Sequence, residues 1–238
     1  MSNGWLGILV SFFVFGSLVG CDVETITPSP SPTPIITPTS TPTSTPTPTP
    51  TTSPATEPKP GTWPSEWNVP ITEAQLSQTL TQTPEDIAEV CPHYQELPTT
   101  EKEDFWVIFF MGLAKVESDW NRRSRYVETT MGPDAVTGLQ IVSEGLLQLS
   151  YQDQKYYGCD FDWIHDRPLQ EIDLKHPQKT IFDPIKNISC AMVIFKSQIR
   201  RKHKVFTASY WSPLLEKRSS AGYQRLMTYL RQNAKFCQ

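Results

Sequence analysis

Histidine and net positive charge are both scarce in this 238-residue chain. The four histidines, His93, His165, His176 and His203, are not spaced like metal ligands. Lysine and arginine number 21, against 25 aspartate and glutamate residues. This balance gives no indication of nucleic-acid binding through bulk charge. We therefore expect no metal, no other cofactor and no nucleic-acid partner.

Internal repeats and alternating strand-like patterns are also lacking, whereas apolar residues recur at helical spacing in several segments. Glu103–Val116 has a broad apolar face and predicts a buried helix. A second helix is expected over Phe182–Arg201, where Asp183 can cap and Pro184 fits the first turn. The other expected elements are helices over Gly222–Ala234 and Glu144–Tyr156, weaker helical patterns over Thr72–Leu80 and Pro84–Val90, and a small hairpin within Gly132–Val142. The sequence thus predicts a mainly α-helical domain with few short strands.

No apolar stretch spans a bilayer comfortably, although Trp5–Val19 is almost wholly apolar. A stretch of this length is typical of an export signal. Its end, Leu18-Val19-Gly20-Cys21, resembles a bacterial lipobox. That resemblance implies a signal peptide over residues 1–20 and a lipid on Cys21 after cleavage. An ordinary signal peptide or a membrane anchor is the alternative. The lipoprotein interpretation predicts a cell-envelope protein held to a membrane by lipid and facing the periplasm.

Residues 21–60 form a segment of low complexity, dominated by Thr, Pro and Ser from Thr25 onward. Such a segment cannot bury a core, and each proline lacks a backbone donor. We expect an extended, disordered linker with a reach on the order of 100 Å, at about 3.1 Å per residue. Residues 61–238 fit one domain, which we expect to be a monomer.

The four cysteines beyond Cys21 suggest disulfides, because an even number in an exported domain favours them. Three pairings are possible. We favour Cys159 with Cys190 and Cys91 with Cys237, the second joining the two ends of the domain. Free buried thiols are the alternative.

An acidic motif ends the most apolar helical segment. KVESDWN, at Lys115–Asn121, follows EDFWVIFFMGLA. Three more fragments follow in order, SEGLLQLS (143–150), FDPIKNI (182–188) and ASYW (208–211). This ordered set resembles the soluble lytic transglycosylase and goose-type lysozyme family. That family shows Glu-Ser at a helix end, then Gly-Leu-Met-Gln, then Asn-Ile and then Ala-Tyr-Asn. Here leucine replaces the methionine and Trp211 stands in place of the asparagine.

The resemblance implies a lysozyme-like fold that cleaves the β-1,4 bond between MurNAc and GlcNAc in peptidoglycan strands. In a lytic transglycosylase one glutamate acts first as acid and then as base, and the product is a 1,6-anhydro sugar. Glu117 matches that glutamate. Tyr210 would orient Glu117 by a hydrogen bond, and Asn187 would hold the loop that carries Gly145 to Gln148. The residues expected to contact the substrate or support the site are Ser118, Gly145, Leu146, Gln148, Asn187 and Tyr210.

The position of Glu117 also suits an acid on physical grounds. Glycoside cleavage needs a proton donor for the leaving oxygen. Burial raises the pKa of a carboxyl group, and a helix C-terminus disfavours its charge by about 0.3–1 kcal/mol. The alternatives are a solvated glutamate at a helix end, and a noncatalytic domain that binds glycan without cutting it.

Other acidic residues leave a hydrolytic reaction open. Glu128 or Asp134 could position a water molecule, which would make the enzyme an inverting lysozyme. Glu144 stands where the family often has a small residue. If Glu144 lay near Glu117, like-charge coupling would raise the pKa of one of the two carboxyl groups. We favour the interpretation that Glu144 is a solvated residue in the first turn of a helix.

Overall fold

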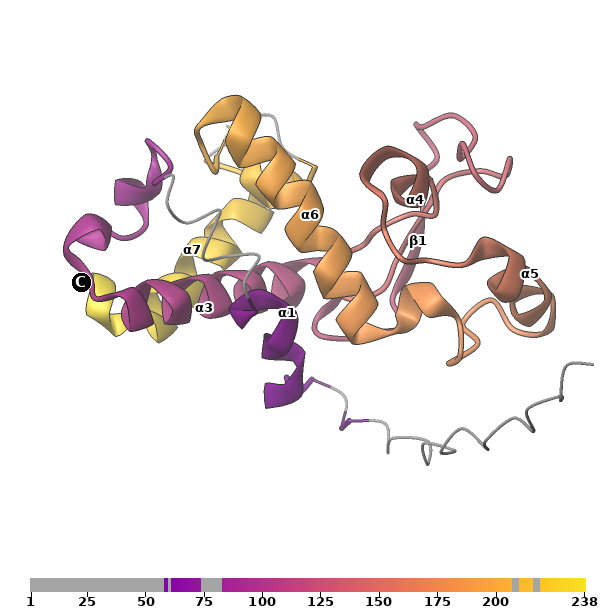
Figure 1. Ribbon diagram of the computed structural model, residues 1–238, viewed down its shortest axis with the longest axis horizontal. Coiled ribbons are helices and arrows are strands. Elements are labelled where there is room, and N and C mark those ends of the chain that lie inside the picture. The colour runs from indigo at the N-terminus through magenta and orange to yellow at the C-terminus, as the bar shows by residue number, and fades with distance from the viewer. Residues whose placement is uncertain (1–57, 60, 74–82, 207–209, 216–218) are drawn as a thin grey trace, which may run out of the picture. The chain divides into compact units, whose positions relative to one another are not determined.

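The computed structural model describes residues 58–59, 61–73, 83–206, 210–215 and 219–238. The expected signal peptide, the lipid site at Cys21 and nearly all of the linker lie outside these residues. So do most of the helix expected over Thr72–Leu80 and the Ala208-Ser209 pair. The described part is mainly α-helical with one small sheet, as the sequence predicts (Figure 1). Its helices are α1 (Val69–Thr72), α3 (Thr99–Ser118), α4 (Gln152–Tyr157), α5 (Trp163–Ile172), α6 (Pro184–Lys202) and α7 (Ala221–Asn233).

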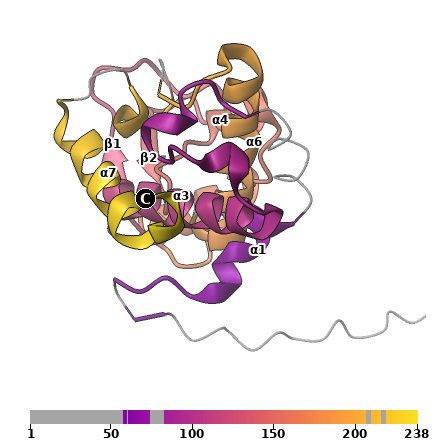
Figure 2. The same cartoon turned by 90° about the vertical axis from the view of Figure 1, so that its left-hand side faces the viewer.

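Helix α3 is the centre of the core. Its aromatic side chains pack against each other and against α6, where the Phe195 ring lies 5.3 Å from Trp106 and 5.2 Å from Phe110. Figure 2 shows α3 with α7 on one side and α6 on the other. The helix ends at Ser118 because Asp119 takes a left-handed conformation, with φ 53°. The buried helix expected over Glu103–Val116 is confirmed.

Close approach of α7 to α3 depends on a glycine. A Cβ atom at Gly112 would lie 2.6 Å from Cδ1 of Tyr229, which real side-chain packing does not tolerate. Because Gly112 has no side chain, α7 lies along α3 toward its C-terminal end. The helix predicted over Gly222–Ala234 is therefore confirmed as α7.

Helix α6 begins as its sequence predicts. The Asp183 side chain accepts the backbone N–H of Lys186 at 2.9 Å, and Pro184 is the first helical residue. Apolar residues on one face, including Ile188, Ala191 and Ile199, are buried. Burial of this face and the cap together fix the helix over almost the predicted range.

The small sheet is an antiparallel hairpin of β1 (Arg125–Val127) and β2 (Val142–Glu144). Arg125 pairs with Glu144 in the register, and Val127 with Val142. A hairpin forms, but not within the predicted range Gly132–Val142. Strand β1 precedes that range, β2 begins at its last residue, and the range itself holds an isolated bridge between Pro133 and Gln140. The helix predicted from Glu144 is wrong, because Glu144 lies in β2 and helix begins only at Gln152. Helix α5, which Asp162 caps, was not predicted.

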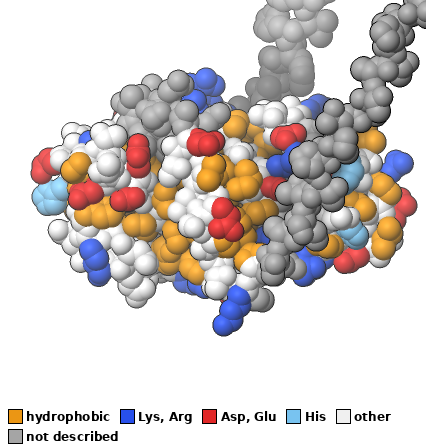
Figure 3. Space-filling view, turned by 60° about the horizontal axis from the view of Figure 1, so that its bottom comes forward, with side chains coloured by type: hydrophobic (Ala, Val, Ile, Leu, Met, Phe, Trp, Pro, Cys, Tyr) orange, Lys and Arg blue, Asp and Glu red, His pale blue; other side chains and the backbone are white. Residues whose placement is uncertain are grey.

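Two disulfides join segments that are distant in sequence. Cys91 bonds to Cys237, across 146 positions of sequence, and Cys159 bonds to Cys190 in α6. Both pairs are those favoured from the sequence. Within the described residues, no helix is long and apolar enough to cross a membrane. On the face in Figure 3, acidic and basic side chains are interspersed around a central group of apolar ones.

Candidate active site

Glu117 lies in the last turn of α3, where two hollows of the surface meet. The hairpin cleft, of about 730 Å³, is lined by Glu117, Glu128, Ser143, Gln148, Tyr210 and Ser212 among others. The α7 cleft, of about 790 Å³, is lined by Glu117, Ser118, Gln224, Arg225, Thr228 and Tyr229 among others. Glu117 and Ser124 line both. A chain-like ligand that runs through both clefts would therefore pass Glu117.

The carboxyl group of Glu117 holds a proton unusually well. Burial raises its pKa, the negative charge of Glu128 raises it further, and the positive charge of Arg225 opposes both, which leaves a pKa of about 7. Among the described residues, no side chain donates a hydrogen bond to this carboxyl. At neutral pH about half of the Glu117 carboxyl groups therefore carry a proton that is available to a ligand.

Glu128 is the second carboxyl group in the hairpin cleft. It follows β1 directly, and its backbone N–H donates to the carbonyl of Ile141 at 2.9 Å. The Ser143 hydroxyl donates to Oε1 of Glu128 at 2.6 Å. Because Ser143 belongs to β2, the hairpin register itself sets the position of the Glu128 carboxylate.

Asp134, the other acid considered for a water-positioning role, faces inward. Its Oδ1 accepts the backbone N–H groups of Val136 and Thr137, and its Oδ2 accepts that of Gln152. Asp134 is buried, so both oxygens are occupied by the chain. The proposed role for Asp134 is therefore wrong, and Glu128 is the acid that faces the hairpin cleft.

The loop after β2 places Gln148 in the hairpin cleft. Gly145 has φ 84°, and a Cβ atom there would clash with the Asn187 amide. Asn187 is fully buried, accepts the N–H of Leu147 at 2.9 Å, and donates to the carbonyls of Ile181 and Glu144. Leu146 is buried in the core. The Gln148 side chain donates to the Gly145 carbonyl at 2.8 Å. These contacts are those expected of a loop held by Asn187.

Tyr210 lines the hairpin cleft but does not orient Glu117 in the expected way. Its hydroxyl donates to Oδ2 of Asp153 at 2.6 Å, so its single proton is committed there. Burial raises the pKa of Asp153 to about 6, opposed first by this hydrogen bond from Tyr210. A buried carboxylate needs such a donor, which explains why Tyr210 turns toward Asp153. The prediction that Tyr210 donates a hydrogen bond to Glu117 is therefore wrong.

Ser118, next to Glu117, lines the α7 cleft. Its hydroxyl donates to the carbonyl of Ala114 at 3.0 Å, within the last turn of α3. Trp120 supports the same turn, because its indole N–H donates to the Met111 carbonyl at 2.8 Å. These two bonds tie Ser118 and Trp120 to backbone carbonyls of α3 and so help to fix the turn that carries Glu117.

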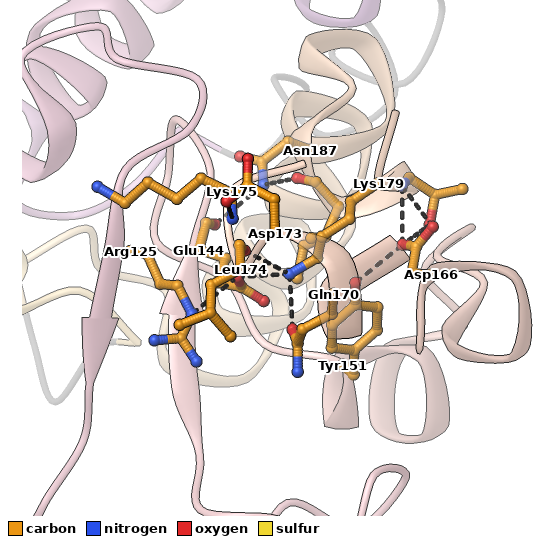
Figure 4. Close-up of polar contacts among 12 residues, drawn as sticks. Arg125, Glu144, Tyr151, Asp166, Gln170, Asp173, Leu174, Lys175, Lys179 and Asn187 are labelled. Carbon is orange, nitrogen blue, oxygen red and sulfur yellow. Dashed lines mark hydrogen bonds and ion pairs between the residues drawn. The ribbon is translucent and has the colours of Figure 1, made fainter. Parts of the chain in front are cut away.

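Glu144 is neither solvated nor coupled to Glu117. It is buried with Lys179, whose Nζ lies 2.7 Å from its Oε1, and Nε of Arg125 lies 3.3 Å from the same oxygen (Figure 4). Lys179 also donates to Gln170 and to the Leu174 carbonyl. Burial raises the pKa of Glu144, and the two cations oppose that rise. The expectation of a solvated residue was wrong because its partner, Lys179, is distant in sequence.

Comparisons with known proteins bear on the fold. No protein-family model and no curated protein matches the chain. Solved structures of Bd0314 DslA, a Bdellovibrio protein, do match. The wild-type form is 22% identical, with a TM-score of 0.56 over 73% of this chain and 91% of that one. Two glutamate-to-glutamine variants match with TM-scores of 0.58 and 0.57, at the same identity and coverage. The chain therefore shares the fold of Bd0314 DslA.

In the part of the chain that the structure describes, no group of three or more His, Cys, Asp or Glu side chains is placed to hold a metal ion. Glu117 and Glu128 are the two carboxyl groups that line the hairpin cleft, and carboxyl groups can exchange protons with a ligand.

Proposed function

We propose that the chain is a glycan-cleaving enzyme that acts on the β-1,4 bond between MurNAc and GlcNAc in peptidoglycan, with Glu117 as general acid. The observation that carries this proposal is the position of Glu117 at the junction of two clefts, with a pKa of about 7. A pKa near the working pH is the best compromise between holding a proton and releasing it. The proton passes from Glu117 to the glycosidic oxygen as the C1–O bond breaks.

Glu128 supports hydrolysis as the outcome. It lines the hairpin cleft with Glu117, and the Ser143 hydroxyl holds its carboxylate. In an inverting mechanism Glu128 takes a proton from water while the water oxygen bonds to C1, and Glu117 protonates the leaving sugar. In the two variants of Bd0314 DslA the substituted glutamates lie 11 positions apart. Glu117 and Glu128 have the same spacing of 11 positions, which further supports the pair.

A lytic transglycosylase is the second candidate. The ordered motifs around Glu117, Gly145–Gln148 and Asn187 favour it, because they resemble that family. In this reaction Glu117 first protonates the leaving oxygen and then removes the proton of the substrate's C6 hydroxyl as that oxygen bonds to C1. No water is consumed and no second carboxylate is required.

Product masses from purified sacculi separate the candidates. Hydrolysis gives reducing-end muropeptides, whereas a transglycosylase gives anhydro products that are lighter by one water. We expect reducing ends from the wild-type chain and almost none from Glu128→Gln. Anhydro products that persist in Glu128→Gln would establish the transglycosylase instead. Wall binding without soluble fragments would leave a noncatalytic glycan-binding protein.

We also propose that a lipid on Cys21 tethers the domain to a membrane facing the periplasm, which the lipobox-like Leu18–Cys21 supports. The Thr/Pro/Ser-rich segment would then let the domain reach the wall. Cys21→Ala is expected to move the protein from the membrane fraction to the soluble fraction. Complete recovery of that variant with membranes would contradict the lipid anchor.

A further inference from the structure

The two clefts that meet at Glu117 differ in the charge that they offer a ligand. The hairpin cleft contains the carboxylate of Glu128, and its cation, Arg125, is paired with Glu144. The α7 cleft contains the guanidinium of Arg225. A glycan strand bound across Glu117 would place one sugar in each cleft. The sugar on the α7 side would thus meet a cation close to the bond that breaks.

Helix packing brings Arg225 to this position. Gly112 allows α7 to approach α3, and Tyr229 packs at the contact. Arg225 lies four residues, or about one turn, before Tyr229, on the part of α7 that faces the end of α3. Its positive charge reaches Glu117 strongly enough to oppose the rise in the pKa of that carboxyl.

Arg225 and Lys115 are cations that line the α7 cleft, and they differ in their partners. Lys115, the other cation in the α7 cleft, is paired with Asp119 and lies over the Trp120 ring, 4.3 Å from its centroid. Among the described residues, no carboxylate forms an ion pair with Arg225, which is exposed. When Glu117 carries its proton, Arg225 faces a neutral acid across the cleft. A bound carboxylate would then be its natural partner.

We propose that Arg225 binds a carboxylate of the substrate, carried by the sugar or peptide in the α7 cleft, and so selects acidic glycans over neutral ones. This inference rests on the proposed function and names the substrate feature that the site recognises. Peptidoglycan carries carboxylates on its peptides and on those lactyl groups that bear no peptide, whereas chitin has none. A guanidinium can donate two parallel hydrogen bonds to one carboxylate, which a neutral group cannot match.

The experiment compares sacculi with the same sacculi whose carboxylates have been converted to amides, so that the glycan backbone is unchanged. Wild-type enzyme is expected to cleave the acidic material about tenfold more efficiently, since one charge-assisted hydrogen bond contributes that order of magnitude. Arg225→Ala should cleave both materials at nearly the same rate, because the loss of its charge acts on Glu117 equally with either material and only the preference depends on the substrate carboxylate. Arg225→Lys should retain part of the preference.

Arg231→Ala is the matched control, because Arg231 lies on α7 outside both clefts and loses the same charge. It should behave as wild type. A preference for acidic sacculi that survives in Arg225→Ala would overturn the proposal. An equal loss on both materials would also overturn it, because Arg225 would then act through Glu117 alone. Failure of the proposed function would look different: wild type would cleave neither material, or Glu117→Gln would cleave both.

Discussion

Glu117 and Glu144 are both withdrawn from water, yet the charged side chains around them differ in sign. Glu144 is fully enclosed with Lys179 and Arg125, and these cations oppose the rise in its pKa that burial causes. Glu117 has another carboxylate, Glu128, as a close charged neighbour, and only the exposed Arg225 opposes it. Burial therefore makes a useful acid only where the neighbouring charge does not compensate it.

The two sites also do different work in the fold. The Lys179–Glu144–Arg125 group joins β2 to β1 and to the segment before α6, and all three Lys179 contacts are buried or partly buried. The residues before and after Glu144 in the sequence, Ser143 and Gly145, shape the hairpin cleft. Glu144 thus holds the strand that positions Glu128, whereas the carboxyl of Glu117 forms no ion pair among the described residues.

The largest expected effect is the loss of cleavage in Glu117→Gln. The amide cannot donate an acidic proton, so muropeptide release should fall by about 10²–10⁴-fold. Glu101→Gln, in the first turn of the same helix, is the matched control and should release muropeptides normally. Unchanged release from Glu117→Gln would reject the assigned acid.

Disrupting the buried group of Lys179, Glu144 and Arg125 should affect the stability of the domain more than its cleavage activity. Lys179→Met leaves Glu144 buried without its main partner, which typically costs about 3–5 kcal/mol of unfolding free energy. Urea denaturation of the domain measures this cost. Adding Glu144→Gln removes the buried charge and keeps an acceptor for Arg125, so most of the loss should be recovered. If the double variant is no more stable than Lys179→Met, the Glu144 charge is not the source of the cost.

Because the pKa of Glu117 is raised, the difference in unfolding free energy between Glu117→Gln and wild type should depend on pH. The native state binds the proton more tightly than the unfolded state, so this contribution is complete below pH 4.5 and is lost as the pH rises through 7. Relative to wild type, Glu117→Gln should become more stable over that window, by up to about 3 kcal/mol. Denaturation midpoints at several pH values provide the measurement. A constant difference across the range would contradict the shift.

The smallest expected effect is a change in the pKa of Glu117 in the variant Glu128→Gln. Removing the like charge lowers the pKa of Glu117, since Glu128 is the second cause of the rise after burial. The change is measured by titrating the Glu117 carboxyl in both proteins. Asp134→Asn serves as the comparison, because the Asp134 carboxylate is turned into its own loop. An equal pKa in wild type and Glu128→Gln would show that burial alone raises it.

Local patterns in the sequence predict the helices that bury one face. In α3 and α6 apolar residues recur at helical spacing, and Asp183 and Pro184 mark the start of α6. The segment after Glu144 misleads for the same reason, because Leu146, Leu147 and Leu149 are buried without forming a helix. A loop held by Asn187 buries them instead, and that partner is 40 positions from Leu147.

The candidate site divides in the same way. Glu117 is visible in the sequence because a helix end and an ordered motif set mark it. The partners that decide its chemistry are set by tertiary contacts, such as Ser143 with Glu128 and Tyr210 with Asp153. Tyr210 and Asp153 are 57 positions apart, so no local pattern could show that the hydroxyl of Tyr210 is already engaged.

The most direct test of the central claim is an NMR titration of the Glu117 side-chain carboxyl in the intact wild-type protein, with Glu117→Gln used to assign the signal. A carboxyl group that is partly buried beside Glu128 should titrate with a pKa of about 7. A pKa near 4.5, the ordinary value for a glutamate, would mean that Glu117 is ionised at neutral pH and cannot serve as the acid.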